Sequence, residues 1–232
     1  MRVLFFILVV FAFSVAAQTP LAKQSFEKAT IKAQKAQYEA AIEDYRTAIF
    51  QAQFETANDD FRAVIHFNIG VCYYQLKNSD KAVEEFTEAI KLSRRNYQKA
   101  FYALGMAHGD LKNWRKAATS FHRAVALKPD DGEAWFDLAM VLLEEKDYAA
   151  AEKAFQKAIK YKSVSFADAH NNLGVISALK GDFAAAENDF ENALIGSNGK
   201  SSEARNNLQF CKTYKQNYNR DLLAKLEFSR KK

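Results

Sequence analysis

A pattern of small and aromatic residues recurs about every 34 residues, and it constrains the fold more than any other feature of the chain. In each copy an Ala is followed by an aromatic residue and then by a second Ala, all at helical spacing. Small residues let helix backbones approach closely, and the aromatic ring fills the space beside them. The first column contains Ala41, Ala82, Ala117, Ala151 and Ala186, the aromatic column Tyr45, Phe86, Phe121, Phe155 and Phe190, and the second small column Ala48, Ala89, Ala124, Ala158 and Ala193.

Residues 98–131 show the complete repeating unit. Phe101, Leu104 and Ala107 lie on one face of a first expected helix, and the polar pair Lys112-Asn113 marks a turn. A second apolar helix face follows, and Pro129 ends it. Two short helices of this kind cannot bury their apolar faces alone, so each unit needs a neighbouring unit to pack against.

The first helix of most units also carries a Leu-Gly-like pair. These pairs are Ile69-Gly70, Leu104-Gly105, Leu138-Ala139 and Leu173-Gly174. Together with the Ala and aromatic columns, they make the chain resemble the tetratricopeptide repeat family. The resemblance implies an all-α fold, a right-handed α-solenoid of about five helix-turn-helix repeats. The expected repeats are residues 21–55, 63–96, 98–131, 132–165 and 167–200.

The two ends of the chain differ from the repeats. Residues 1–17 have a positive Arg2, an apolar run and a small-residue cleavage pattern, which together predict a signal peptide. The apolar run is shorter than the roughly 20 residues of a membrane span, although an uncleaved anchor is an alternative. The signal peptide predicts export, to the periplasm or the cell exterior if the protein is bacterial.

After the last repeat, residues 203–228 are predicted to form one further solvating helix with a basic tail. Residues 212–232 contain seven Lys or Arg against two Asp or Glu, and the formal net charge of the chain is +5. Such a tail is either a solvated helix end or a weak contact for an anionic membrane surface. Aromatic residues are not interleaved with the charges as in nucleic-acid-binding segments, so no nucleic acid is expected.

No motif predicts catalysis, a cofactor or a metal. The four histidines, His66, His108, His122 and His170, lack partners at the spacing of a zinc site, and no phosphate loop or nucleophile elbow is present. Cys72 and Cys211 lie too many repeats apart for an intramolecular disulfide. We therefore expect a protein that is not an enzyme.

The resemblance implies a concave groove lined by the first helices, where family members bind partners. We expect the groove columns to lie opposite the Leu-Gly face, as an exposed apolar stripe of the kind that marks interaction sites. The alternative is that these side chains pack within the core. The groove residues are predicted to be Phe67, Val71, Tyr74, Tyr102, Met106, Phe136, Met140, Leu143, Asn171 and Val175.

Some family members grip a carboxylate with paired basic residues in this groove, and the chain departs from that pattern. The corresponding positions are Val64/Asn68, Lys99/Ala103, Glu133/Asp137 and Asp168/Asn172. No repeat has both cations, so a carboxylate clamp is not predicted.

These observations favour an exported scaffold that binds a protein or peptide segment in the apolar groove. Self-association through the same face is a variant of this hypothesis. The alternative function is an envelope-surface module tethered by its basic C-terminal tail.

Overall fold

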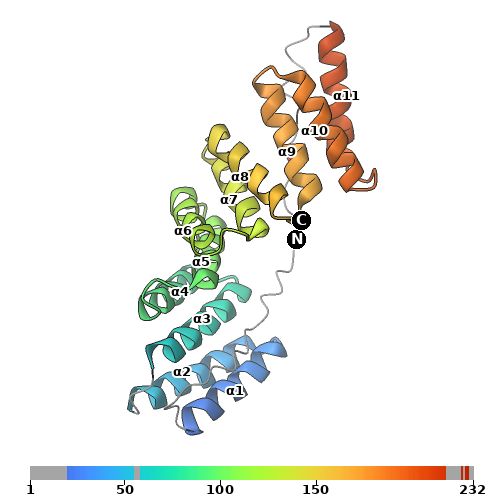
Figure 1. Cartoon of the computed structure of the whole chain (residues 1–232). Helices are drawn as coiled ribbons and strands as arrows, with labels where there is room; N and C mark the ends of the chain where they lie inside the picture. Colours follow the sequence, from blue (N-terminus) through green and yellow to red (C-terminus); the bar gives the residue numbers. More distant parts are fainter. Residues whose placement is uncertain (1–19, 55–57, 218–225, 227, 230–232) are drawn as a thin grey trace. The chain divides into compact units, whose positions relative to one another are not determined.

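The computed structural model describes residues 20–54, 58–217, 226, 228 and 229, and these residues form helices and no strands. Figure 1 shows the helices in chain order. They are α1 (Pro20–Gln34), α2 (Tyr38–Phe54), α3 (Asp59–Gln75), α4 (Ser79–Leu92), α5 (Gln98–Asp110), α6 (Trp114–Leu127), α7 (Gly132–Glu144), α8 (Tyr148–Lys160), α9 (Phe166–Leu179), α10 (Phe183–Gly196) and α11 (Ser202–Asn217).

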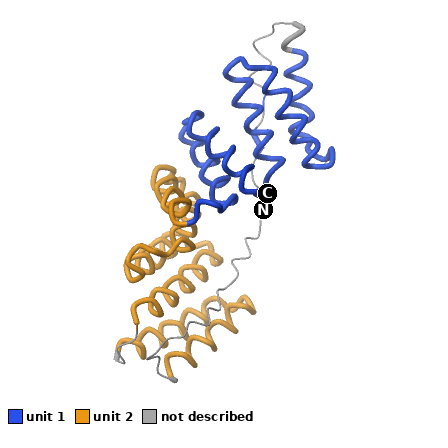
Figure 2. The backbone as a smooth tube through the Cα atoms, viewed as in Figure 1, with its two compact units in different colours: residues 1–2, 128–232 blue, residues 3–127 orange. Residues whose placement is uncertain are grey.

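Consecutive helices pack in pairs: α1 with α2, α3 with α4, α5 with α6, α7 with α8, and α9 with α10. The chain divides into two compact units, coloured separately in Figure 2. Unit 2, residues 3–127, contains α1 to α6, and unit 1, residues 1–2 and 128–232, contains α7 to α11. Within unit 1, α11 packs mainly on α10 and also touches α9.

The repeated columns form the contact inside each helix pair. Phe86, Phe121 and Phe190 of the second helices are buried, and their rings lie directly over Gly70, Gly105 and Gly174 of the first helices. A Cβ atom added to those glycines would lie only 2.6–2.9 Å from the nearest ring carbon. A side chain at any of these three glycines would therefore force the ring or the helix to shift.

The same type of two-residue turn joins the two helices in each of four pairs. Its first residue has a positive φ, between 57° and 85°, and its second is Asn or Asp. In α7/α8 the Asp147 N–H donates to the Leu142 carbonyl at 2.9 Å, ending the first helix. The Asp147 carboxylate accepts the Ala150 N–H at 3.0 Å, starting the second. The turns are Lys77-Asn78, Lys112-Asn113, Lys146-Asp147 and Gly181-Asp182.

Helix α3 begins at Asp59, before residue 63 where the second expected repeat starts, because Asn58 caps it by accepting the Asp60 N–H. The structure departs from the sequence expectation after the last repeat. Helix α11 is described from Ser202 to Asn217, and the described residues Leu226 and Phe228 are not helical although a helix was predicted over residues 203–228. The predicted signal peptide lies outside the described residues. Among the residues described, no helix is long and apolar enough to cross a membrane.

Candidate functional site

The predicted groove column Phe67, Tyr102, Phe136 packs against the aromatic column of the second helices. The ring centroids are 5.7 Å apart for Phe67 with Phe86 and 5.6 Å for Phe136 with Phe155. Phe67 is 2% exposed and Phe136 is 0% exposed, so neither belongs to an open stripe. The expected exposure is wrong because residues three and four positions apart share a helix face, which places Phe67 beside Gly70 rather than opposite it.

The remaining predicted groove residues divide by exposure. Tyr102, Met106, Met140 and Leu143 are partly exposed, and their binding of a partner stays a prediction. The buried members, which cannot serve as open surface in this structure, are Val71, Tyr74, Asn171 and Val175.

Unit 1 contains a polar contact that the residue columns did not predict. Asn172 in α9 is 0% exposed, and its side-chain Nδ2 donates to the Ser229 carbonyl oxygen at 2.9 Å. The Ser229 N–H donates to Asn172 Oδ1 at 2.5 Å. A primary amide has the donor and acceptor needed to bond both polar groups of one peptide residue. Asn172 therefore holds the backbone of Ser229 on both sides, which a helical Ser229 would not allow.

Apolar contacts accompany the hydrogen bonds between Asn172 and Ser229. Leu226 and Phe228 pack against a cluster that includes Val175, and the Phe228 ring stacks on Tyr148, with centroids 6.4 Å apart and planes at 11°. We call Leu226, Phe228 and Ser229 the tail segment. We call the residues around the tail segment the Asn172 site. They contact the segment or hold its contacts in place, and they are Met140, Tyr148, Asn172 and Val175.

Two of these residues were in the predicted groove, and two were not. The Met140 sulfur lies 3.4 Å from Asn172 Nδ2, and Val175 belongs to the apolar cluster. The sequence offered one signal for Asn172: it occupies one of the positions where some family members have the basic residues that grip a carboxylate. Nothing in the local pattern identified Tyr148 as a partner of Phe228, because that contact joins residues far apart in the chain.

Neighbouring asparagines have different structural roles. Asn171 Oδ1 accepts a hydrogen bond from Asn207 Nδ2 at 2.9 Å and so holds α9 to α11. Asn68 occupies in α3 the column that Asn172 occupies in α9. It is also buried, but neither of its side-chain polar atoms has a hydrogen-bond partner. Its amide still lies close enough to Tyr45 to oppose partly the rise in the Tyr45 pKa that burial causes.

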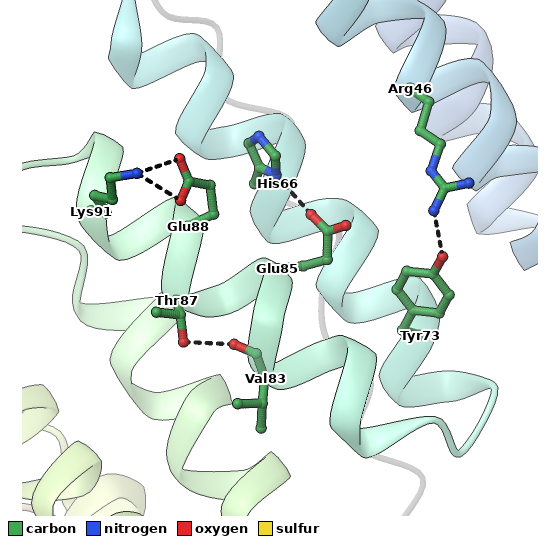
Figure 3. Close-up of polar contacts among 8 residues, drawn as sticks. All are labelled: Arg46, His66, Tyr73, Val83, Glu85, Thr87, Glu88 and Lys91. Carbon is green, nitrogen blue, oxygen red and sulfur yellow. Dashed lines mark hydrogen bonds and ion pairs between the residues drawn. The ribbon is translucent and has the colours of Figure 1, made fainter.

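Two histidines link the two helices of a pair through contacts to carboxylates. The His66 Nδ1 is 2.7 Å from a Glu85 oxygen, and the equivalent His170 is 2.8 Å from Asp189. Figure 3 shows His66 with Glu85, and beside it the Arg46 guanidinium donating to the Tyr73 hydroxyl at 2.8 Å. No group of metal-binding side chains occurs among the residues that the structure describes.

Cys72 and Cys211 are both buried and unbridged, as the repeat spacing predicts. Burial raises the pKa of the Cys72 thiol to about 12. At neutral pH it is a protonated thiol, which is a poor nucleophile.

Curated proteins match part of the chain, and two of them illustrate the likeness. Sperm-associated antigen 1 from Homo sapiens is 29% identical over 128 residues, covering 53% of this chain and 14% of that protein. Superkiller protein 3 from Saccharomyces cerevisiae is 33% identical over 103 residues, covering 41% of this chain and 7% of that protein. This chain therefore corresponds to only a small part of each relative's length.

Solved structures match over most of the chain. YrrB, described as a TPR protein with an unusual peptide-binding site, superposes with a TM-score of 0.65 at 23% identity, covering 77% of this chain and 88% of that one. MamA from Desulfovibrio magneticus RS-1 gives a TM-score of 0.67 at 22% identity, covering 80% and 100%. At these identities the likeness shows the fold alone. It confirms the predicted all-α class.

Comparison of the sequence with family models agrees with the fold that the structures indicate. Models of the tetratricopeptide repeat match residues 63–96, 102–166 and 147–204. Together these ranges span more than half of the 232 residues. The helix pairs, the glycine–aromatic contacts between their helices and these matches all agree, and the chain belongs to the tetratricopeptide repeat family.

Proposed function

We propose that this protein is a non-enzymatic interaction scaffold, and that the Asn172 site binds an extended segment of a partner protein. One observation carries the proposal: the Asn172 amide bonds both the N–H and the carbonyl of Ser229. Hydrogen bonds to a ligand's main chain provide affinity for extended peptides of many sequences, and pockets for alternate side chains provide selectivity.

The residues around Asn172 define the ligand's chemistry. Tyr148 stacks on an aromatic side chain, Phe228, immediately before the bonded residue. The apolar cluster takes a second side chain, Leu226, two positions earlier. Ser229 is 4% exposed, so the bonded residue is enclosed and must be small. The expected ligand is an extended segment with two apolar residues in alternate positions, the second aromatic, followed by a small residue.

Relatives support this class of function. Proteins of this fold include YrrB, which is described as having a peptide-binding site. The partly exposed Met140 and Leu143 of unit 1 are suited to extend the contact, and Tyr102 and Met106 could act in the same way in unit 2. Export from the cytoplasm remains part of the proposal and rests on the signal-peptide pattern of residues 1–17.

The tether hypothesis has less support. A tail that serves only to attach the protein to an anionic surface has no need of contacts with the repeats. Phe228 and Ser229 instead make stacking and hydrogen-bonding contacts within unit 1. We therefore favour a scaffold over a tether.

A peptide library displayed on phage tests the proposed function. The full chain and an Asn172→Ala variant are panned in parallel, with Asn68→Ala as the control, since that substitution removes the same buried amide from the same column in another repeat. We expect the full chain and the control to enrich peptides of the apolar–x–aromatic–small type. Enrichment of the same peptides by Asn172→Ala would refute the assignment of this site.

A further inference from the structure

The Asn172 site already holds a ligand that belongs to the chain. Ser229 and Asn172 are 57 positions apart, so residues that follow α11 in the chain lie against α9. The tail segment fills the backbone-bonding position, the stacking position on Tyr148 and the place beside the apolar cluster at once. It therefore occupies every contact that an external peptide of the proposed class would use.

We propose that the tail segment is a built-in competitive ligand of the Asn172 site, and that a partner's extended segment binds only by displacing it. This inference rests on the proposed function, because it identifies both the ligand class of that site and the device that limits its access. No other conformational change is required, since the displaced and displacing segments make the same contacts.

The effective concentration of the tail at its own site sets how strongly it competes with a partner's segment. A segment joined by a short linker reaches an effective concentration of about 1 mM at its own site. If the same segment in trans binds with a Kd of about 0.1 mM, the tail weakens any competing peptide about tenfold. Such a margin prevents weak, non-specific peptides from binding but lets a tighter partner bind. The tail thus sets an affinity threshold.

The first test asks whether the tail occupies the site in solution. Amide hydrogen exchange of the full chain should show a protected Ser229 N–H, and Asn172→Ala should remove that protection while Asn68→Ala leaves it. The protection should not depend on protein concentration. An unprotected Ser229 would overturn the proposal, and protection that rises with concentration would replace it with exchange of tails between copies.

The second test measures competition directly. A fluorescent peptide of residues 224–232, AKLEFSRKK, is titrated into the full chain and into a full-length Leu226→Ala/Phe228→Ala variant, whose own tail is weakened. We expect the variant to bind the peptide at least tenfold more tightly than the unaltered chain. Adding Asn172→Ala should abolish the binding, adding Asn68→Ala should not, and a control peptide, AKLEASRKK, should bind neither protein. Equal affinity of the two proteins would refute the competition.

The outcomes separate this inference from the proposed function. If peptides selected from the library bind the Asn172 site but AKLEFSRKK does not, the scaffold function stands and the built-in ligand is wrong. If neither kind of peptide binds the tail-weakened variant, the site takes no ligand in trans and both proposals fail. Circular dichroism confirms that each variant keeps its helices.

Discussion

Single glycines determine how closely the helices of a pair approach. In α5, Gly105 lies under the Phe121 ring, whereas Gly109 of the same helix has no atom within 4 Å of the place where its Cβ would be. The two positions have the same residue and secondary structure, so only their surroundings differ. They form a matched pair for measuring what the aromatic contact requires.

Gly105→Ala should destabilise the protein by about 1–3 kcal/mol, because the added Cβ would lie 2.9 Å from two ring carbons of Phe121. Gly109→Ala should stabilise it by about 0.5–1 kcal/mol, because Ala favours the helix and meets nothing. Urea unfolding followed by circular dichroism measures both. A Gly105→Ala variant as stable as Gly109→Ala would show that the ring moves aside at little cost.

Another residue-scale effect concerns His108, which is 8% exposed and has no hydrogen-bond partner at Nδ1. Burial, assisted by the Lys116 charge, lowers its pKa below the usual value. The unfolded chain therefore takes up a proton first as the pH falls, so this contribution to stability decreases from about pH 6.5 downward, until the pH reaches the folded-state pKa.

His108→Gln should consequently lose less stability than the unaltered chain between about pH 7.5 and pH 5. Every other titrating group is common to both proteins, so the difference isolates His108. Urea midpoints at the two pH values are the measurement. Parallel pH dependence of the two proteins would mean that His108 is protonated equally in the folded and unfolded states.

At the scale of elements, one turn residue ends the first helix and begins the second. Asp147 does both in unit 1, and Asn78 does both in unit 2, where its N–H donates to the Tyr73 carbonyl at 2.9 Å and its side chain accepts from the Lys81 N–H at 3.2 Å. Either Asn or Asp serves, because both side chains have an oxygen that can accept the orphan N–H of the new helix.

Asp147→Ala should cost about 1 kcal/mol, since the Ala150 N–H loses its acceptor. Asp147→Asn should retain most of that stability, because Asn is the natural residue at the equivalent position 78. Thermal unfolding of the two variants side by side tests this. Equal losses from Ala and Asn would assign the effect to the charge at the helix N-terminus instead of the cap.

At the scale of the whole molecule, the main helix contacts join helices that are adjacent in the chain, and weaker contacts join α9 with α11 and α3 with α5. In such an array, stability is approximately a sum of repeat and nearest-neighbour contributions, and damage stays local. The fully buried Phe190 of α10, whose ring covers Gly174 of α9, is one of the contacts that hold this pair together.

Phe190→Ala should cost about 3–5 kcal/mol locally and reduce hydrogen-exchange protection in α9, α10 and α11. Protection in α1 to α3 should stay close to that of the unaltered chain. Phe86→Ala, the equivalent substitution in unit 2, should give the reverse distribution. A uniform loss of protection from either variant would show that the chain unfolds as one cooperative body.

The sequence by itself determined the helix pairs, the turns within them, and the columns of residues that pack between the two helices of each pair. Those features depend on contacts close in the chain, and the same Ala, Gly and aromatic columns recur in successive repeats, so each copy supports the interpretation of the others. The family and the all-α fold could be predicted for this reason. The absence of a disulfide between Cys72 and Cys211 followed from the repeat spacing in the same way.

Only the tertiary structure decided which face of each first helix is buried and what occupies the Asn172 site. Phe67 and Phe136 have the same side chain whether they face a groove or a neighbouring helix, and only the packing partner shows which. The contact between Asn172 and Ser229 joins residues 57 positions apart and involves the backbone of Ser229. A backbone partner has no signature in residue type, so this contact could be found only where the folded chain brings the two together.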